Sequence, residues 1–160
     1  MKLIELTQGF FTKVDDEDYE KFSHFKWYVV IDKRNKYKIK ARAYRRVMGL
    51  NIYLSRQIMN CPKNKQVDHI NGITLDNQKE NLRICTASEN QCNKGKYQNN
   101  TLGYKGIIFD KRDGFFYCRI QVNKKRISLG RFLTARDAGI AYDNATIKYH
   151  KEFTYLKKND

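Results

Sequence analysis

Two adjacent residues near the middle of the chain, Asp68 and His69, offer the groups that hydrolysis of a phosphodiester requires. That reaction needs a base to deprotonate water and a cation to stabilise charge at the phosphate and the leaving oxygen. Neighbouring side chains on a strand point to opposite faces, so the pair can serve both tasks only near a bend. Asn71-Gly72 supplies a turn signal two residues later. An isolated Asp-His pair is more often a surface hydrogen-bonded pair, so the flanking residues decide between the two interpretations.

The elements around this pair are predicted to be a strand, a long polar loop, a second strand and a helix over residues 66–94. Thr86-Ala-Ser-Glu89 is a capping box, which places the start of the helix and puts Asn90 on its opening turn. The amide oxygen of Asn90 can then join Asp68 in holding a metal ion. Most coordination positions are left to water and phosphate, as Mg²⁺ prefers.

The segment DHINGITLDNQKENLRICTASEN, residues 68–90, resembles the signature of HNH nucleases of the phage and intron-homing type. The resemblance implies a ββα-metal core that binds one divalent ion, Mg²⁺, for which Mn²⁺ can substitute. It implies that His69 is the general base and that Asp68 and Asn90 are the metal ligands. Asn81 corresponds to the middle asparagine of the signature, which braces the loop and orients the histidine.

Residues 1–60 alternate short β-like runs with polar turns and predict a small, basic, β-rich unit leading into the nuclease. The acidic stretch 15–18 lacks the spacing of a calcium loop and predicts a solvated turn before a short helix from Tyr19 to Phe25. This region also resembles the leader of such nuclease modules, with Ser55 where relatives often have a histidine. Pro62 marks a break, so the nuclease core is predicted over residues 61–97.

The C-terminal part, residues 103–156, follows a predicted linker at 98–102 and reads as three strands and a helix opening at Thr134. In the second strand, residues 115–122, the side chains are expected to alternate between a face that packs on the helix and a face that is exposed. The helix residues expected to pack on the sheet are Ala138, Ala141, Tyr142, Ala145 and Tyr149. The residues expected on the opposite, outward face of the sheet are Tyr117, Arg119, Gln121, Arg126 and Ser128.

The same region resembles an Apetala-two-type DNA-binding domain in its YKG, its LG-F step and its A-AYD-A helix. Phe116 stands where a tryptophan is usual, and Ser128 where an aromatic residue is often found. A basic, hydrogen-bonding sheet face suits readout of the DNA major groove by strands. The predicted DNA-binding residues are Lys105, Tyr117, Arg119, Gln121, Arg126 and Ser128.

The composition favours an anionic partner, because 32 Lys and Arg against 17 Asp and Glu give a net charge of +15. The excess lies in residues 1–60 and 103–160, while the middle is closer to neutral. No apolar run approaches the length of a bilayer span, and no signal peptide is recognisable, so a membrane partner is not expected. The four cysteines form no CxxC pair, which predicts small, reduced, buried residues in a cytoplasmic setting.

The sequence therefore predicts an α+β chain with a β-rich N-terminal unit, a ββα-metal core, and a three-stranded antiparallel sheet packed on one helix. The predicted function is a metal-dependent, homing-type DNA endonuclease of a bacterial or phage-infected cell. Its C-terminal domain would position it on double-stranded DNA, with no obligate protein partner. One alternative is a DNA-binding regulator with a catalytically inactive HNH fold. An RNA-binding module also fits the charge, but it does not account for the nuclease signature.

Overall fold

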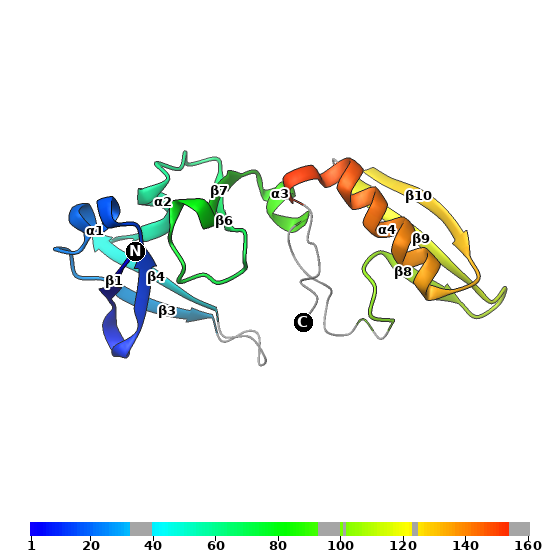
Figure 1. Ribbon diagram of the computed structural model, residues 1–160, viewed down its shortest axis with the longest axis horizontal. Helices are drawn as coiled ribbons and strands as arrows, with labels where there is room; N and C mark the ends of the chain where they lie inside the picture. The colour runs from blue at the N-terminus through cyan, green and yellow to red at the C-terminus, as the bar shows by residue number, and fades with distance from the viewer. Residues whose placement is uncertain (33–39, 93–99, 101, 123–124, 154–160) are drawn as a thin grey trace. The chain divides into compact units, whose positions relative to one another are not determined.

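The computed structural model describes the chain except for residues 33–39, 93–99, 101, 123–124 and 154–160. The described residues form a mixed α+β structure with two compact units, Met1–Thr86 and Ala87–Asp160 (Figure 1). Each unit has its own hydrophobic core. Of the predicted linker, residues 98, 99 and 101 lie outside the described part of the chain.

The first unit is built from three small antiparallel sheets, with strand orders β1-β2, β3-β4-β5 and β6-β7. Two short α-helices and 3-10 turns connect them. In chain order its elements are β1 (Lys2–Glu5), η1 (Thr7–Gly9), β2 (Phe11–Val14), α1 (Asp16–Phe22), β3 (Tyr28–Asp32), β4 (Lys40–Val47), β5 (Leu50–Tyr53), α2 (Leu54–Ile58), β6 (Gln66–His69), η2 (Lys79–Asn81) and β7 (Leu82–Cys85).

One core serves this whole unit. Val14 of β2 and Leu54 of α2 have no exposed surface, and Trp27, just before β3, is 2% exposed. Leu82 of β7 belongs to the same cluster, and Val67 of β6 packs against it. β6, which carries Asp68 and His69, and its partner β7 are therefore packed directly on elements from residues 1–60.

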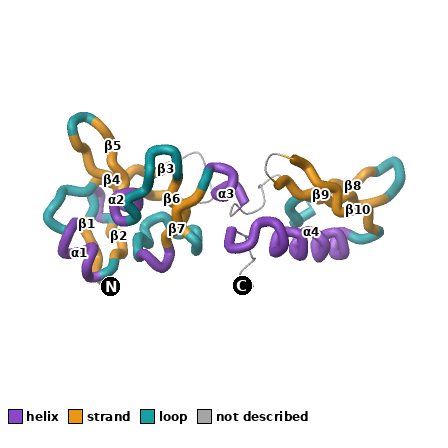
Figure 2. Tube along the Cα trace, turned by 90° about the horizontal axis from the view of Figure 1, so that it is seen from above, coloured by secondary structure: helices purple, strands orange, loops and turns teal. Residues whose placement is uncertain are grey.

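The second unit contains α3 (Ala87–Cys92), β8 (Ile107–Asp110), β9 (Phe115–Val122), β10 (Lys125–Phe132), α4 (Ala135–His150) and η3 (Lys151–Phe153). Its strands form an antiparallel sheet of order β10-β9-β8, and α4 packs along one face of it (Figure 2). The predicted three strands and helix are all present. α4 begins as expected, with the hydroxyl of Thr134 accepting a hydrogen bond from the backbone N–H of Asp137 at 3.1 Å.

The packing face of α4 differs in part from the predicted stripe. Ala138, Tyr142 and Ala145 are buried as expected, but Tyr149 remains 36% exposed. Gly139 and Thr146 complete the buried face instead. A Cβ on Gly139 would lie 2.5 Å from the ring of Tyr104, so the absence of a side chain admits the aromatic ring. The helical spacing of the predicted stripe could not identify Gly139 as a packing residue, because its partner, the ring of Tyr104, comes from outside the helix.

Among the described residues, no helix is both long enough and apolar enough to cross a membrane.

Candidate functional site

Asp68 and His69 occupy the last two positions of β6, and each is only 8% exposed. In the antiparallel register they pair with Arg83 and Leu82 of β7. The chain turns immediately afterwards, with the N–H of Gly72 donating to the carbonyl of His69 at 2.9 Å and Gly72 in the left-handed region at φ 74°. This is the bend that an adjacent acid and base require.

The carboxylate of Asp68 is held by the neighbouring strand. The Nε and Nη2 groups of Arg83 both donate to its Oδ2, at 2.9 and 2.7 Å. Both side chains are largely buried, so this charge-assisted pair fixes where the carboxylate lies. The sequence interpretation did not select Arg83, although it lies in the ENLR run, because its position opposite Asp68 depends on the strand register.

The imidazole of His69 has Asn77 as a side-chain partner, with Nε2 of His69 3.1 Å from Oδ1 of Asn77. Burial lowers the pKa of His69 below its usual 6.5. The contact with Asn77 and the charge of Asp68 act in the opposite direction, and the charge of Arg42 on β4 lowers the pKa further. The net shift favours the neutral ring, which is the form that can accept a proton.

Asn81 closes the loop that follows β6. Its Oδ1 accepts from the backbone N–H of Asn71 at 2.9 Å, and its Nδ2 donates to the backbone carbonyl of Asp76 at 2.8 Å. The side chain of Asn71 also donates to the carboxylate of Asp76 at 2.8 Å. Asn81 therefore ties together the two ends of the 71–76 loop, as bracing by a middle asparagine requires.

The far end of this loop is anchored on β2 of the N-terminal hairpin. Lys13 donates from its N–H to the carbonyl of Leu75 and accepts from the N–H of Asn77, both at 2.9 Å. These bonds form a short parallel bridge between Lys13 and Asp76. The hairpin thus supports the candidate site directly.

The acidic stretch 15–18 also contacts the loop, which corrects the prediction of a solvated turn. α1 begins at Asp16, and Asp15 accepts from the backbone N–H of Lys79 at 2.8 Å. Asp18 is only 2% exposed, with its carboxylate 3.6 Å from Nζ of Lys79. Asp15 and Asp18 lie inward because Lys79 of the 3-10 turn η2, far away in the sequence, donates to Asp15 and brings its ammonium close to Asp18. Asp16 and Glu17 remain exposed, as predicted.

Asn90, the other predicted metal ligand, lies on α3 and is half-buried. α3 begins at Ala87, directly after Thr86, as the capping box predicts. Asn90 therefore belongs to the second compact unit, whereas Asp68, His69 and Asn81 belong to the first. Within the described residues, no group of three or more His, Cys, Asp or Glu side chains is arranged to hold a metal ion.

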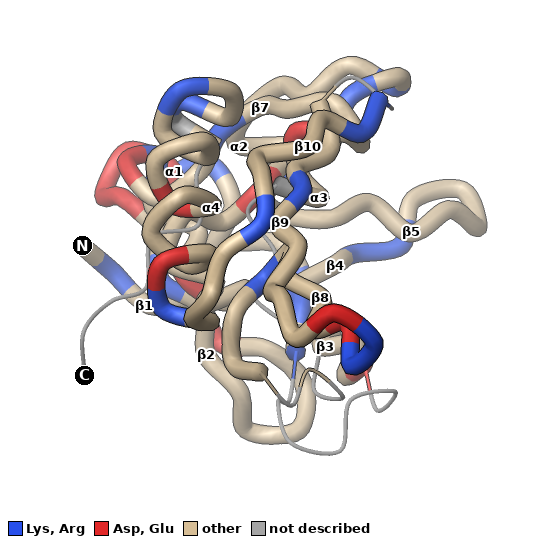
Figure 3. The backbone as a smooth tube through the Cα atoms, turned by 90° about the vertical axis from the view of Figure 1, so that its right-hand side faces the viewer, with Lys and Arg blue, Asp and Glu red and all other residues tan. Residues whose placement is uncertain are grey.

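The outward face of the β8–β10 sheet brings together most of the predicted DNA-binding residues. Tyr117, Arg119 and Gln121 alternate along β9 and are exposed. Arg126 and Ser128 of β10 lie opposite Gln121 and Arg119 in the register. Figure 3 shows Lys and Arg positions along both strands. Lys105, which was predicted with this set, is half-buried and lies before β8, outside the strands.

Arg131 joins this face but was not predicted. A register shift between Ser128 and Gly130 places Arg131 opposite Tyr117, and its guanidinium lies 4.8 Å from the centre of the Phe115 ring. A β-bulge of this kind changes which residues of a strand share a face. Regular alternation of side chains along β10 would place Arg126, Ser128 and Gly130 on the exposed face, so the sequence pattern did not predict Arg131 there.

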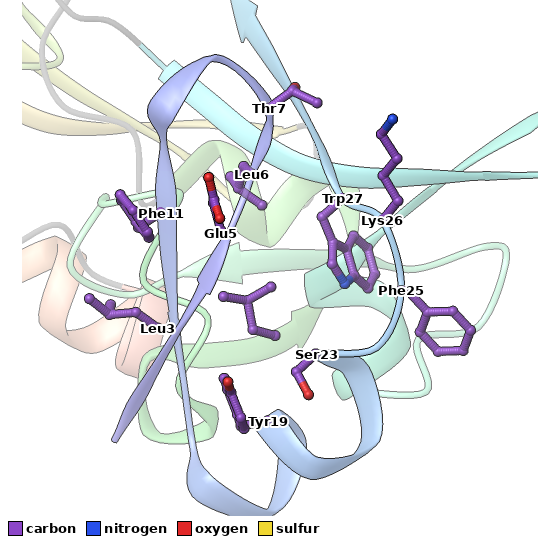
Figure 4. A pocket seen from close by; sticks show the side chains of 11 residues that line it. Leu3, Glu5, Leu6, Thr7, Phe11, Tyr19, Ser23, Phe25, Lys26 and Trp27 are labelled. Carbon is purple, nitrogen blue, oxygen red and sulfur yellow. The ribbon is translucent and has the colours of Figure 1, made fainter.

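A cavity of about 610 Å³ lies on the first unit, between the β1–β2 hairpin, α1 and the approach to β3 (Figure 4). Its lining combines aromatic and aliphatic side chains, such as Phe11 and Trp27, with polar ones, such as Glu5 and Lys26. It includes none of the residues around His69. The cavity is therefore separate from the candidate site, which is the polar cluster at the end of β6.

The cysteines agree in part with the predicted buried, reduced residues. Cys85 and Cys118 are buried and Cys61 is half-buried, and all three are free thiols. The side chain of Cys92 lies outside the described residues. Burial raises the pKa of the Cys118 thiol to about 11, so that side chain stays protonated at neutral pH.

Comparison with known proteins finds two partial similarities. Residues 60–92, which run through β6, β7 and α3, match the family model of HNH endonucleases. This match supports a nuclease domain acting on DNA.

A second similarity joins the chain to an AP2/ERF and B3 domain-containing transcription factor of Arabidopsis thaliana, with 34% identity over 74 residues. The matched part is 46% of this chain and 20% of that protein, so the chain spans about a fifth of the relative's length. The similarity supports the presence of a DNA-binding domain. No solved structure matches the chain.

Proposed function

We propose that this protein is a metal-dependent DNA endonuclease of the homing HNH type, in which residues 61–97 cut and residues 103–156 position the enzyme on duplex DNA. The observation that carries the proposal is the buried pair at the end of β6. His69 is shifted toward its neutral form beside a carboxylate fixed by Arg83, at a bend inside the segment that matches HNH endonucleases.

His69 is the proposed general base, which takes a proton from the water that attacks phosphorus. Asn81 keeps the loop closed around it through its bonds to Asn71 and Asp76. Arg83 holds the Asp68 carboxylate in place. Each role uses a contact that already exists in the protein, so the site is organised before substrate arrives.

Asp68 and Asn90 are the proposed ligands of one divalent ion, Mg²⁺ or Mn²⁺ in its place. A carboxylate and an amide supply hard oxygen donors and leave positions for water and phosphate, so the donor set fits Mg²⁺. When bound, such an ion stabilises negative charge on the phosphate and on the leaving oxygen.

The outward face of the second unit is the proposed DNA-contacting surface. Its strands present exposed arginines with hydrogen-bonding neighbours, a combination that suits contacts to base edges and phosphates. The proposed contact residues are Lys105, Tyr117, Arg119, Gln121, Arg126 and Ser128, to which the register adds Arg131.

The deciding experiment is incubation of supercoiled plasmid with the protein and Mg²⁺. We expect nicked or linear product, none of it when a chelator is in excess, and little with Asp68→Ala. Cleavage that persists in excess chelator contradicts the metal-dependent mechanism. Tight DNA binding without any cleavage, over a range of duplex targets, would instead support a DNA-binding regulator with an inactive HNH fold.

A further inference from the structure

A chain of buried side-chain hydrogen bonds runs from the N-terminal hairpin to the ring of His69. The hydroxyl of Thr12 lies 2.8 Å from the carbonyl oxygen of Leu75, and Nδ2 of Asn77 lies 2.7 Å from the same hydroxyl. Oδ1 of Asn77 then lies 3.1 Å from Nε2 of His69. Thr12 has no exposed surface and Asn77 is 1% exposed, so both side chains are shielded from water.

The direction of every hydrogen in this chain follows from the chemistry of its members. A carbonyl oxygen only accepts, so Thr12 must donate its single hydroxyl hydrogen to Leu75. The hydroxyl can then only accept from Asn77, which must turn its NH₂ group toward Thr12. The amide oxygen of Asn77 is left facing His69, and this oxygen also only accepts.

We propose that Thr12 and Asn77 are positioning residues that hold His69 with its hydrogen on Nε2 and its lone pair on Nδ1. A neutral imidazole carries one N–H, so a donating Nε2 leaves Nδ1 as the basic atom. The inference rests on the proposed function, since it assigns which atom of His69 takes the proton from water. The sequence assigned no role to Thr12 or to Asn77, although Asn77 lies within the segment that resembles the HNH signature.

The loop is already held in place by backbone hydrogen bonds, so the proposed role of the Thr12 hydroxyl differs from support of the loop. Lys13 already anchors the loop through its bonds to Leu75 and Asn77. The Thr12 hydroxyl adds a contact that determines which end of the Asn77 amide faces the ring. Without the hydroxyl, the amide can rotate by half a turn and present its NH₂ group to Nε2, which would move the ring hydrogen to Nδ1.

The first test reads the tautomer directly. The protein carrying His24→Gln and His150→Gln retains His69 as its sole histidine, because the chain has three. Long-range ¹H–¹⁵N correlation spectra at about pH 8, where a histidine ring is neutral, distinguish the two ring nitrogens. We expect the hydrogen on Nε2. A ring with its hydrogen on Nδ1 would overturn the proposal, whatever any further variant does.

The second test compares Thr12→Val, which keeps the shape but removes the hydroxyl, with Thr12→Ser, which keeps the hydroxyl. We expect Thr12→Val to lower kcat roughly tenfold or more at unchanged KM, since the lone pair of His69 would then lie on the wrong ring nitrogen. Thr12→Ser should retain kcat near the wild-type value. In Thr12→Val the spectrum of His69 should shift toward the Nδ1–H form.

A merely structural role would lower the unfolding midpoint of Thr12→Val and leave kcat and the tautomer of the folded protein unchanged, and that result would overturn the proposal. Should Thr12→Val not fold, the spectrum of the sole-histidine protein still decides. Failure of the proposed function is separable, because it appears as a wild-type protein that does not cut DNA. In that event the tautomer is still read from the spectrum alone.

Discussion

The two units of this protein hold their proposed functional residues in different ways. In the first unit, the loop after β6 is tied to partners far away in sequence, such as Asp15 for Lys79 and Thr12 for Asn77. In the second unit, the exposed face is made by strands that follow one another in the sequence and pair with one another. The proposed chemistry therefore depends on contacts between residues far apart in the sequence, whereas the proposed recognition surface depends on the alternation of exposed and buried side chains along each strand. Each of the following predictions tests this division.

The largest effect is expected from His69→Ala. Cleavage should slow roughly a hundredfold or more, the usual scale for loss of a general base. DNA affinity should hold, because the proposed contact surface lies in the other unit. Single-turnover cleavage and equilibrium binding would be measured side by side, with His24→Ala as control, since the ring of His24 contacts that of Phe25 and His24 has no proposed role in the site. Cleavage by His69→Ala within a few-fold of wild type would remove His69 as the base.

A smaller effect, on affinity alone, is expected from Arg119→Ala or Arg126→Ala. An arginine that reads a base contributes about 1–3 kcal/mol, so Kd should rise from about fivefold to over a hundredfold at unchanged kcat. Arg112→Ala is the matched control, because Arg112 is 90% exposed on the β8–β9 turn and pairs with Asp110. An arginine that meets only phosphate would weaken all sequences evenly, with a salt slope smaller by about one. Unchanged Kd in both variants would move recognition away from this face.

Loss of the α4 cap should affect one unit only. Thr134→Ala removes the acceptor for the N–H of Asp137 and should cost about 0.5–2 kcal/mol of unfolding free energy. Thr134→Ser should restore it. The single tryptophan, Trp27, lies in the core of the first unit, so its fluorescence reports that unit while helical circular dichroism follows α4. A shift of the Trp27 transition together with the helix would show that the two units do not unfold separately.

The smallest effect is expected in the pH dependence. Burial lowers the pKa of His69 below 6.5, so the base becomes neutral as pH rises and activity should be half-maximal at a pH below 6.5. The unfolded chain binds the proton more readily than the folded one. The corresponding stability is therefore present above the unfolded value and lost as pH falls through the folded pKa. A cleavage profile that is flat between about pH 5 and 8 would argue against a histidine base.

The parts of the molecule that were predictable from sequence are those with a local signal. The capping box at Thr86 located the start of α3, and the alternation in FFYCRIQV separated buried Cys118 and Ile120 from exposed Tyr117 and Arg119. Both signals extend over a few residues and reflect the periods of a helix and a strand. Because such local signals define it, the proposed recognition face is more predictable from the sequence than the proposed catalytic site.

The residues that could not be predicted from the sequence have partners that lie outside any short stretch of sequence around them. Arg83 contacts Asp68 fifteen residues earlier, and Asp15 binds Lys79 from 64 residues away. Asn77 stands in a polar loop where an asparagine is ordinary, and its burial arises only when β2 covers it. Arg131 was missed because one irregular position in β10 shifts every later side chain.

The hydrogen bonds from Thr12 also impose an order on biosynthesis. Thr12 leaves the ribosome long before Leu75 and Asn77, which follow it by 63 and 65 residues. The contacts of the Thr12 hydroxyl can therefore form only after the later segment emerges, and contacts of such long separation form slowly. The sheet and α4 of the second unit join segments that leave the ribosome one after another. A nascent chain would thus acquire the geometry around the proposed base, His69, only after most of the first unit has been made.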